Sequence, residues 1–71
     1  MDSIKQNIYE IENEIAELFS KYEKINSAIE ILENEGFNLP EKIYGKRDYY
    51  LSEIKYQENI LLRLKRISNF Y

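Results

Sequence analysis

The chain has 71 residues, ten basic and 13 acidic side chains, and neither cysteine nor histidine. These absences exclude disulfides, thiolate metal sites, the usual zinc ligands and every nucleophilic pair that needs an imidazole base. At this length the stability that a single hydrophobic core supplies is marginal unless metals, disulfides or oligomerisation add to it. We therefore expect one domain over residues 1–71 that is not an enzyme, holds no metal or cofactor and gains stability by self-association.

An apolar seam organises the first half of the chain. Its members are separated by alternating steps of four and three, which is the spacing of a helix packed along a partner helix. The predicted core seam consists of Ile4, Ile8, Ile11, Ile15, Leu18, Tyr22, Ile25, Ile29 and Leu32. The spacing predicts a long first helix over about residues 3–35.

Two features predict the end of this helix and the start of the next. Gly36 can take the left-handed conformation that ends a helix, and Phe37 is then placed to pack back on Leu32. Pro40 suits the first turn of a second helix, because its missing N–H costs nothing there. We expect a turn at residues 36–38 and a second helix over about residues 39–70. Gly45 is the point at which this helix could break, although a continuous helix is favoured.

So short a connection makes the two helices antiparallel neighbours. Charge supports the pairing: residues 1–41 hold ten acidic and three basic residues (net −7), whereas residues 42–71 hold seven basic and three acidic ones (net +4). With the bend at residues 36–37, the residues around Glu10–Glu14 should lie near Arg63, Lys65 and Arg66. The expected fold is all-α, an antiparallel, coiled-coil-like hairpin of two helices that dimerises into a four-helix bundle.

The second helix carries a wider apolar arc than the seam of the first helix can cover. Tyrosine is common on this arc, and rigid aromatic side chains with one polar end suit protein interfaces. Large exposed apolar surfaces usually mark contacts. The candidate partner interface consists of Tyr44, Tyr49, Tyr50, Leu51, Tyr56, Ile60, Leu62 and Ile67.

The basic side chains of the second half suggest an alternative, a nucleic-acid accessory protein. Cations of this kind bind phosphates, and aromatic neighbours could stack on a base. The net negative charge of the whole chain opposes this reading, because its field repels a polyanion. The candidate nucleic-acid contacts are Lys42, Lys46, Arg47, Arg63, Lys65 and Arg66.

The sequence favours a non-enzymatic protein–protein interaction module, a small adaptor, regulator or inhibitor that acts through the tyrosine-rich helical face. Its expected partners are a second copy and another protein, with no membrane and no small-molecule substrate. A purely structural oligomerisation unit is the remaining alternative. The chain lacks a signal-peptide layout and a membrane-length apolar run, so we expect a cytoplasmic protein. Its bias towards Ile, Lys, Asn, Glu and Tyr is typical of AT-rich genomes and suggests a phage, viral or plasmid accessory protein, in the host cytoplasm if viral.

Overall fold

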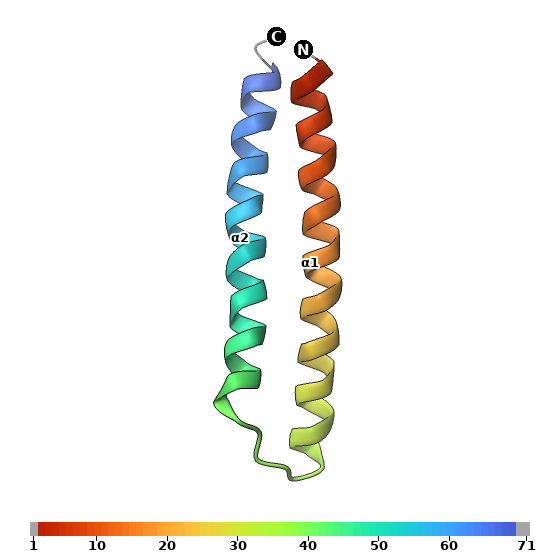
Figure 1. The fold of residues 1–71 in the computed structure, drawn as a ribbon, viewed down its shortest axis with the longest axis vertical. Helices are drawn as coiled ribbons and strands as arrows, with labels where there is room; N and C mark the ends of the chain where they lie inside the picture. Colours follow the sequence, from red (N-terminus) through yellow and green to blue (C-terminus); the bar gives the residue numbers. More distant parts are fainter. Residues whose placement is uncertain (1, 70–71) are drawn as a thin grey trace.

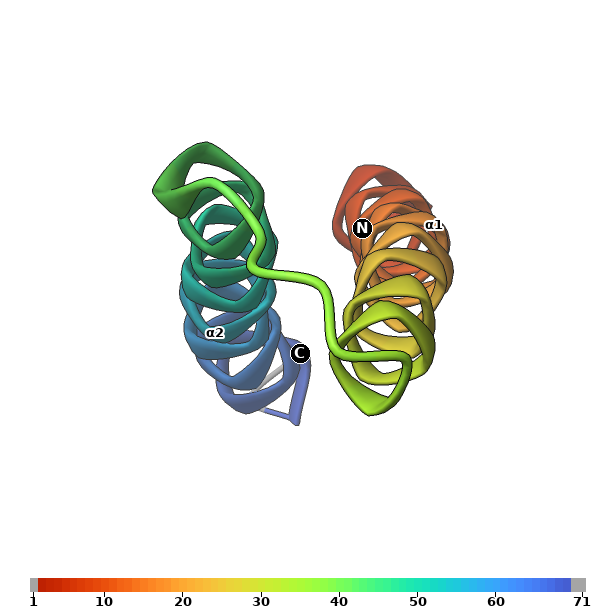
Figure 2. The ribbon, with the colours of Figure 1, turned by 90° about the horizontal axis from the view of Figure 1, so that it is seen from below.

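The computed structural model describes residues 2–69, with the side chains of residues 3–69. Helix α1 spans Asp2–Asn34 and helix α2 spans Glu41–Asn69. The two helices pack side by side and antiparallel over their whole length, as Figures 1 and 2 show from two directions. The hairpin is a rod with Cα extents of 54 × 15 × 14 Å. The expected all-α hairpin is confirmed.

Helix α1 ends in a Schellman motif. Gly36 has a φ of 89°, its N–H donates to the carbonyl of Glu33 (3.0 Å), and the Phe37 N–H donates to the carbonyl of Leu32 (3.0 Å). These are the two hydrogen bonds that define the motif. The Phe37 side chain is nevertheless exposed, so backbone hydrogen bonds, rather than a buried ring, specify the stop.

Helix α2 begins two residues later than expected. Its first turn is closed by a hydrogen bond from the Ile43 N–H to the Pro40 carbonyl (3.1 Å). Proline disfavours the helical conformation in the residue before it, so Leu39 stays outside the helix and the connection runs over residues 35–40. Helix α2 continues through Gly45 without a break. The expected end at residue 70 lies outside the described residues.

Two side-chain contacts join the helices on one side of the hairpin. Lys65 Nζ lies 3.7 Å from Glu12 Oε2, and the Tyr44 hydroxyl donates a hydrogen bond to the Glu33 carboxylate. Side chains lean toward the N-terminus of their own helix, so the two residues of each contact lie at different heights along the hairpin. Near the connection, Ile29 of α1 and Ile43 of α2 line the same groove.

The core is thin. Among the described side chains only Ile29 (1% exposed) and Ile54 (5% exposed) are buried. A pair of helices can shield only the line along which they touch, because each helix is about 10–12 Å across. No described helix is long and apolar enough to cross a membrane.

Candidate interaction surface

The predicted seam of α1 faces α2. Ile29 is its one buried member, and the other eight are half-buried. Helix α2 contributes a matching seam, which the sequence analysis did not separate from the wider apolar arc of this helix. Its members repeat the steps of four and three and are all half-buried or buried: Ile43, Arg47, Tyr50, Ile54, Gln57, Leu61, Leu64 and Ser68. The spacing was present in the sequence, but Arg47, Gln57 and Ser68 interrupt its apolar character.

One side of the hairpin, which we call the Glu12 flank, carries the contact of Lys65 with Glu12 and the contact of Tyr44 with Glu33. On α2 it holds Tyr44, Leu51, Glu58 and Lys65, spaced by seven residues. The hydrogen bond to Glu33 raises the pKa of Tyr44 above its usual 10.0, with smaller contributions in the same direction from desolvation and from the Glu33 charge. The Arg47 guanidinium lies 5.5 Å from the centre of the Tyr44 ring and opposes this shift.

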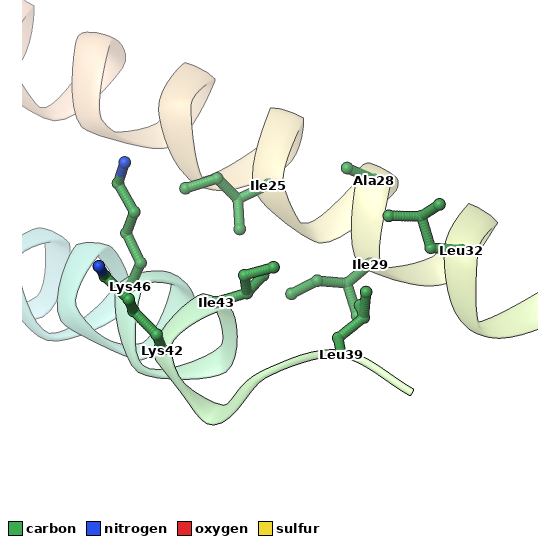
Figure 3. Close-up of a pocket in the computed structure, with 8 residues that line it drawn as sticks. All are labelled: Ile25, Ala28, Ile29, Leu32, Leu39, Lys42, Ile43 and Lys46. Atoms are coloured by element: carbon green, nitrogen blue, oxygen red, sulfur yellow. The ribbon is translucent and has the colours of Figure 1, made fainter. Parts of the chain in front are cut away.

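The other side, which we call the Tyr56 flank, contains an apolar groove near the connection. The groove has a volume of about 350 Å³ and is lined by both helices and by Leu39. Figure 3 shows Ile29, Leu39 and Ile43 pointing toward one another, whereas the amines of Lys42 and Lys46 extend away from the connection. Ile25, Ala28 and Leu32 of α1 complete the lining. The groove therefore has an apolar floor and a cationic edge.

From the groove, the Tyr56 flank continues along α2 at steps of three and four residues. Tyr49 (60% exposed), Tyr56 (61% exposed) and Ile67 are exposed, and Ile60 is half-buried. Charged side chains stand between these apolar residues. On α2 the flank consists of Lys42, Lys46, Tyr49, Glu53, Tyr56, Ile60, Arg63 and Ile67.

The Tyr56 flank also includes residues of α1. Ala28 lines the groove, and the other members lie at steps of three and four residues from it along the helix. This part of the flank is polar over most of its length, and its exposed large apolar member is Ile31. On α1 the flank consists of Asn7, Glu10, Glu14, Glu17, Lys21, Lys24, Ala28 and Ile31.

The structure does not bring the eight candidate interface residues onto one face. Four of them, Tyr49, Tyr56, Ile60 and Ile67, share the Tyr56 flank. Tyr44 and Leu51 lie on the Glu12 flank, and Tyr50 belongs to the seam. Leu62 is exposed on the outer side of α2. Because a helix places residues 100° apart, an arc as wide as the predicted one wraps around both sides of the line of contact.

The six candidate nucleic-acid contacts are also spread over several faces. Lys42, Lys46 and Arg63 lie on the Tyr56 flank, whereas Lys65 pairs with Glu12 on the other flank. Arg47 lies in the seam, with Nε 3.4 Å from Asp48 Oδ1, and Arg66 points outward by helical periodicity. No single face therefore collects more than three of these cations.

The described residues contain no group of three or more Asp or Glu side chains arranged to hold a metal ion. No protein-family model, curated protein or solved structure matches this chain.

Proposed function

We propose that this chain is a non-enzymatic protein–protein interaction module, a small adaptor, regulator or inhibitor that works as a homodimeric four-helix bundle. The observation that carries the proposal is the set of large apolar side chains that α2 leaves exposed, three of them on the Tyr56 flank and Leu62 on the outer side. Tyr49, Tyr56, Leu62 and Ile67 are all at least 45% exposed on this one helix. Large exposed apolar surfaces of this kind are typical of binding sites.

The total surface supports self-association. The chain has 8.6 kDa and an accessible surface of 5812 Å², whereas a compact monomer of this mass exposes about 4,700 Å². The excess of about 1,100 Å² is larger than the ~800 Å² that each partner buries in an interface of standard size. A second hairpin would remove this excess and thicken the core around Ile29 and Ile54.

Light scattering coupled to size exclusion tests the dimer. We expect twice the mass of one chain at tens of micromolar, and a thermal midpoint that rises with protein concentration because association stabilises the folded state by mass action. A folded monomer over this range would rule out the four-helix bundle.

Affinity capture from cells that express the protein tests binding to another protein. We expect one saturable partner whose recovery falls when Tyr49, Tyr56 or Leu62 is replaced by alanine. Tyr9→Ala is the matched control, because Tyr9 is equally exposed (62%) but lies on α1. Unchanged recovery with all three α2 variants would contradict the proposed use of α2.

A further inference from the structure

We propose that the half of the Tyr56 flank next to the connection is the docking site for an acidic amphipathic helix of another protein, whose apolar side lies in the groove. This inference rests on the protein-binding part of the proposed function and adds the site and the chemistry of the partner. We call this part of the surface the lysine half. It consists of Lys21, Lys24, Ala28 and Ile31 of α1 and of Lys42, Lys46 and Tyr49 of α2.

Charge is separated along the Tyr56 flank. The lysine half carries four basic and no acidic residues (net +4). The rest of the flank has a net charge of −3, from Glu10, Glu14, Glu17, Glu53 and Arg63. No ion pair between described side chains involves any of the four lysines. Their positive potential is therefore left for a partner to neutralise.

The acidic residues at the same end of the hairpin lie on the other flank. Glu33 accepts the hydrogen bond of Tyr44 there, and Glu30, Glu41 and Asp48 stand three or four residues from one or other of these two along the helices. Opposite charges thus occupy opposite sides of this end, although the chain as a whole is acidic. An anionic partner is attracted to the lysine half and repelled by the Glu12 flank beside it.

The groove gives the lysine half an apolar floor. Its volume is about 350 Å³, and Lys42 and Lys46 border it on the side of α2 (Figure 3). Ala28 lines both this groove and a second, open hollow on α1, which Lys24 and Ile31 also line. Apolar surface therefore lies between lysines of the two helices.

An amphipathic helix matches both features. Helices of this kind lay apolar anchors, spaced by three or four residues, into a groove, and carboxylates on either side of the anchors would reach the lysines of α1 and α2. From Lys21 to Ile31 the site is about 15 Å long, which corresponds to about three turns of helix. The added helix would also cover Ile31 and Tyr49, which are 58% and 60% exposed. The result is a three-helix bundle at this end of the hairpin.

The length of the site distinguishes this partner from nucleic acid. The carboxylates of the remaining flank begin directly beyond Lys21 and Tyr49, so a long polyanion gains cationic contacts over only about 15 Å and is repelled farther along. Phosphates placed over the apolar floor would lose hydration without a compensating hydrogen bond. A short acidic helix avoids both costs.

A synthetic peptide tests the site. The probe is a fluorescent amphipathic peptide of about 18 residues, long enough for an isolated helix, with one row of leucines and glutamates on both sides of that row. Fluorescence anisotropy should show saturable binding that weakens as salt is raised. Two control peptides, one with lysines in place of the glutamates and one with glutamines in place of the leucines, should bind about tenfold more weakly. Absence of saturable binding, or equal binding of the glutamine peptide, would overturn the inference.

Charge reversal locates the binding. Lys42→Glu/Lys46→Glu should weaken binding of the acidic probe by about tenfold and should bind the lysine peptide instead. Lys55→Glu/Arg66→Glu is the matched control, because it changes the net charge equally but lies away from the Tyr56 flank by helical periodicity. Equal losses in the two double variants would show that net charge alone attracts the probe, which would overturn the site. Circular dichroism verifies that each variant remains helical.

Photo-cross-linking provides a second measurement that leaves the protein unchanged. A photoreactive residue in the leucine row of the probe should attach to groove residues within 25–32 or 39–46, as mass spectrometry of a digest would show. Attachment to the Glu12 flank or to the acidic half of the Tyr56 flank would overturn the assignment.

The outcomes separate this inference from the proposed function. A captured protein partner whose recovery falls with the alanine variants of Tyr49, Tyr56 or Leu62, but not with Lys42→Glu/Lys46→Glu, would leave the interaction module intact and overturn this inference. If that double variant instead weakens self-association in light scattering, the occupant is a second copy, and the inference is wrong. A DNA duplex that binds the wild type more tightly than the probe would overturn it as well.

Discussion

Lys65 Nζ in α2 lies 3.7 Å from Glu12 Oε2 in α1. Both side chains are about half exposed, so this pair contributes at most a few tenths of a kcal/mol to stability. Its importance is positional: together with the Tyr44–Glu33 hydrogen bond at the other end of the Glu12 flank, it joins the two helices on the side opposite the groove.

Tyr44 should ionise above pH 10. The hydrogen bond from its hydroxyl to Glu33 raises its pKa, since the neutral phenol can donate and the phenolate cannot. The stability that this bond contributes is present below pH 10 and is lost as the pH rises through the raised pKa of the folded state. Subtracting the alkaline absorbance titration of Tyr44→Phe from that of the wild type isolates this residue. Its midpoint should lie above 10 and fall in Glu33→Ala; an unchanged midpoint in that variant would contradict the assigned cause.

Ile29→Ala should destabilise the hairpin by about 2–4 kcal/mol, the usual range for removing most of a buried aliphatic side chain. Tyr9→Ala is its control, because Tyr9 lies on the same helix but is 62% exposed and lies outside the Tyr56 flank, and it should change stability by less than about 0.5 kcal/mol. Urea unfolding at one fixed protein concentration measures both. Similar losses in the two variants would show that Ile29 is not the centre of the core.

The two glycines should respond to alanine with opposite signs. Gly45 lies inside α2, and a Cβ atom there would meet nothing within 4 Å, so Gly45→Ala should stabilise the protein by about 1 kcal/mol. Gly36 has a φ of 89°, and Gly36→Ala should destabilise it by about 1 kcal/mol, because L side chains are strained in that conformation. Thermal unfolding followed by circular dichroism measures both changes. A loss of stability in Gly45→Ala would indicate that a partner approaches the backbone closely at this position.

Nucleic acid should bind weakly or not at all. Three cations on one flank of an acidic protein would release few counterions from a phosphate backbone. We expect no mobility shift of DNA or RNA at micromolar protein and about 50 mM salt, where electrostatic binding is strong. A salt-dependent shift that Arg63→Ala reduces would instead favour the nucleic-acid alternative.

The sequence by itself determined the two helices and the line along which the first one packs. The steps of four and three from Ile4 to Leu32 need no tertiary information, because helical geometry alone places those residues on one side. Gly36 likewise predicted the end of α1, since a left-handed residue with two backbone hydrogen bonds is a local structure. The opposite charges of the two halves predicted the ion pairing that Glu12 and Lys65 show.

Only the tertiary structure decided the register and the division of α2 into a seam and two flanks. The register depends on the length of the connection, which Pro40 extends by holding Leu39 out of the helix, and no periodicity reports that length. The seam of α2 includes Arg47 and Gln57, whose long side chains can lie along the contact with their polar ends in solvent. A hydrophobic pattern read without the partner helix places such residues outside the seam. The sequence analysis therefore put Tyr44, Tyr50 and Tyr56 on one face, whereas the contact with α1 places them on the Glu12 flank, in the seam and on the Tyr56 flank.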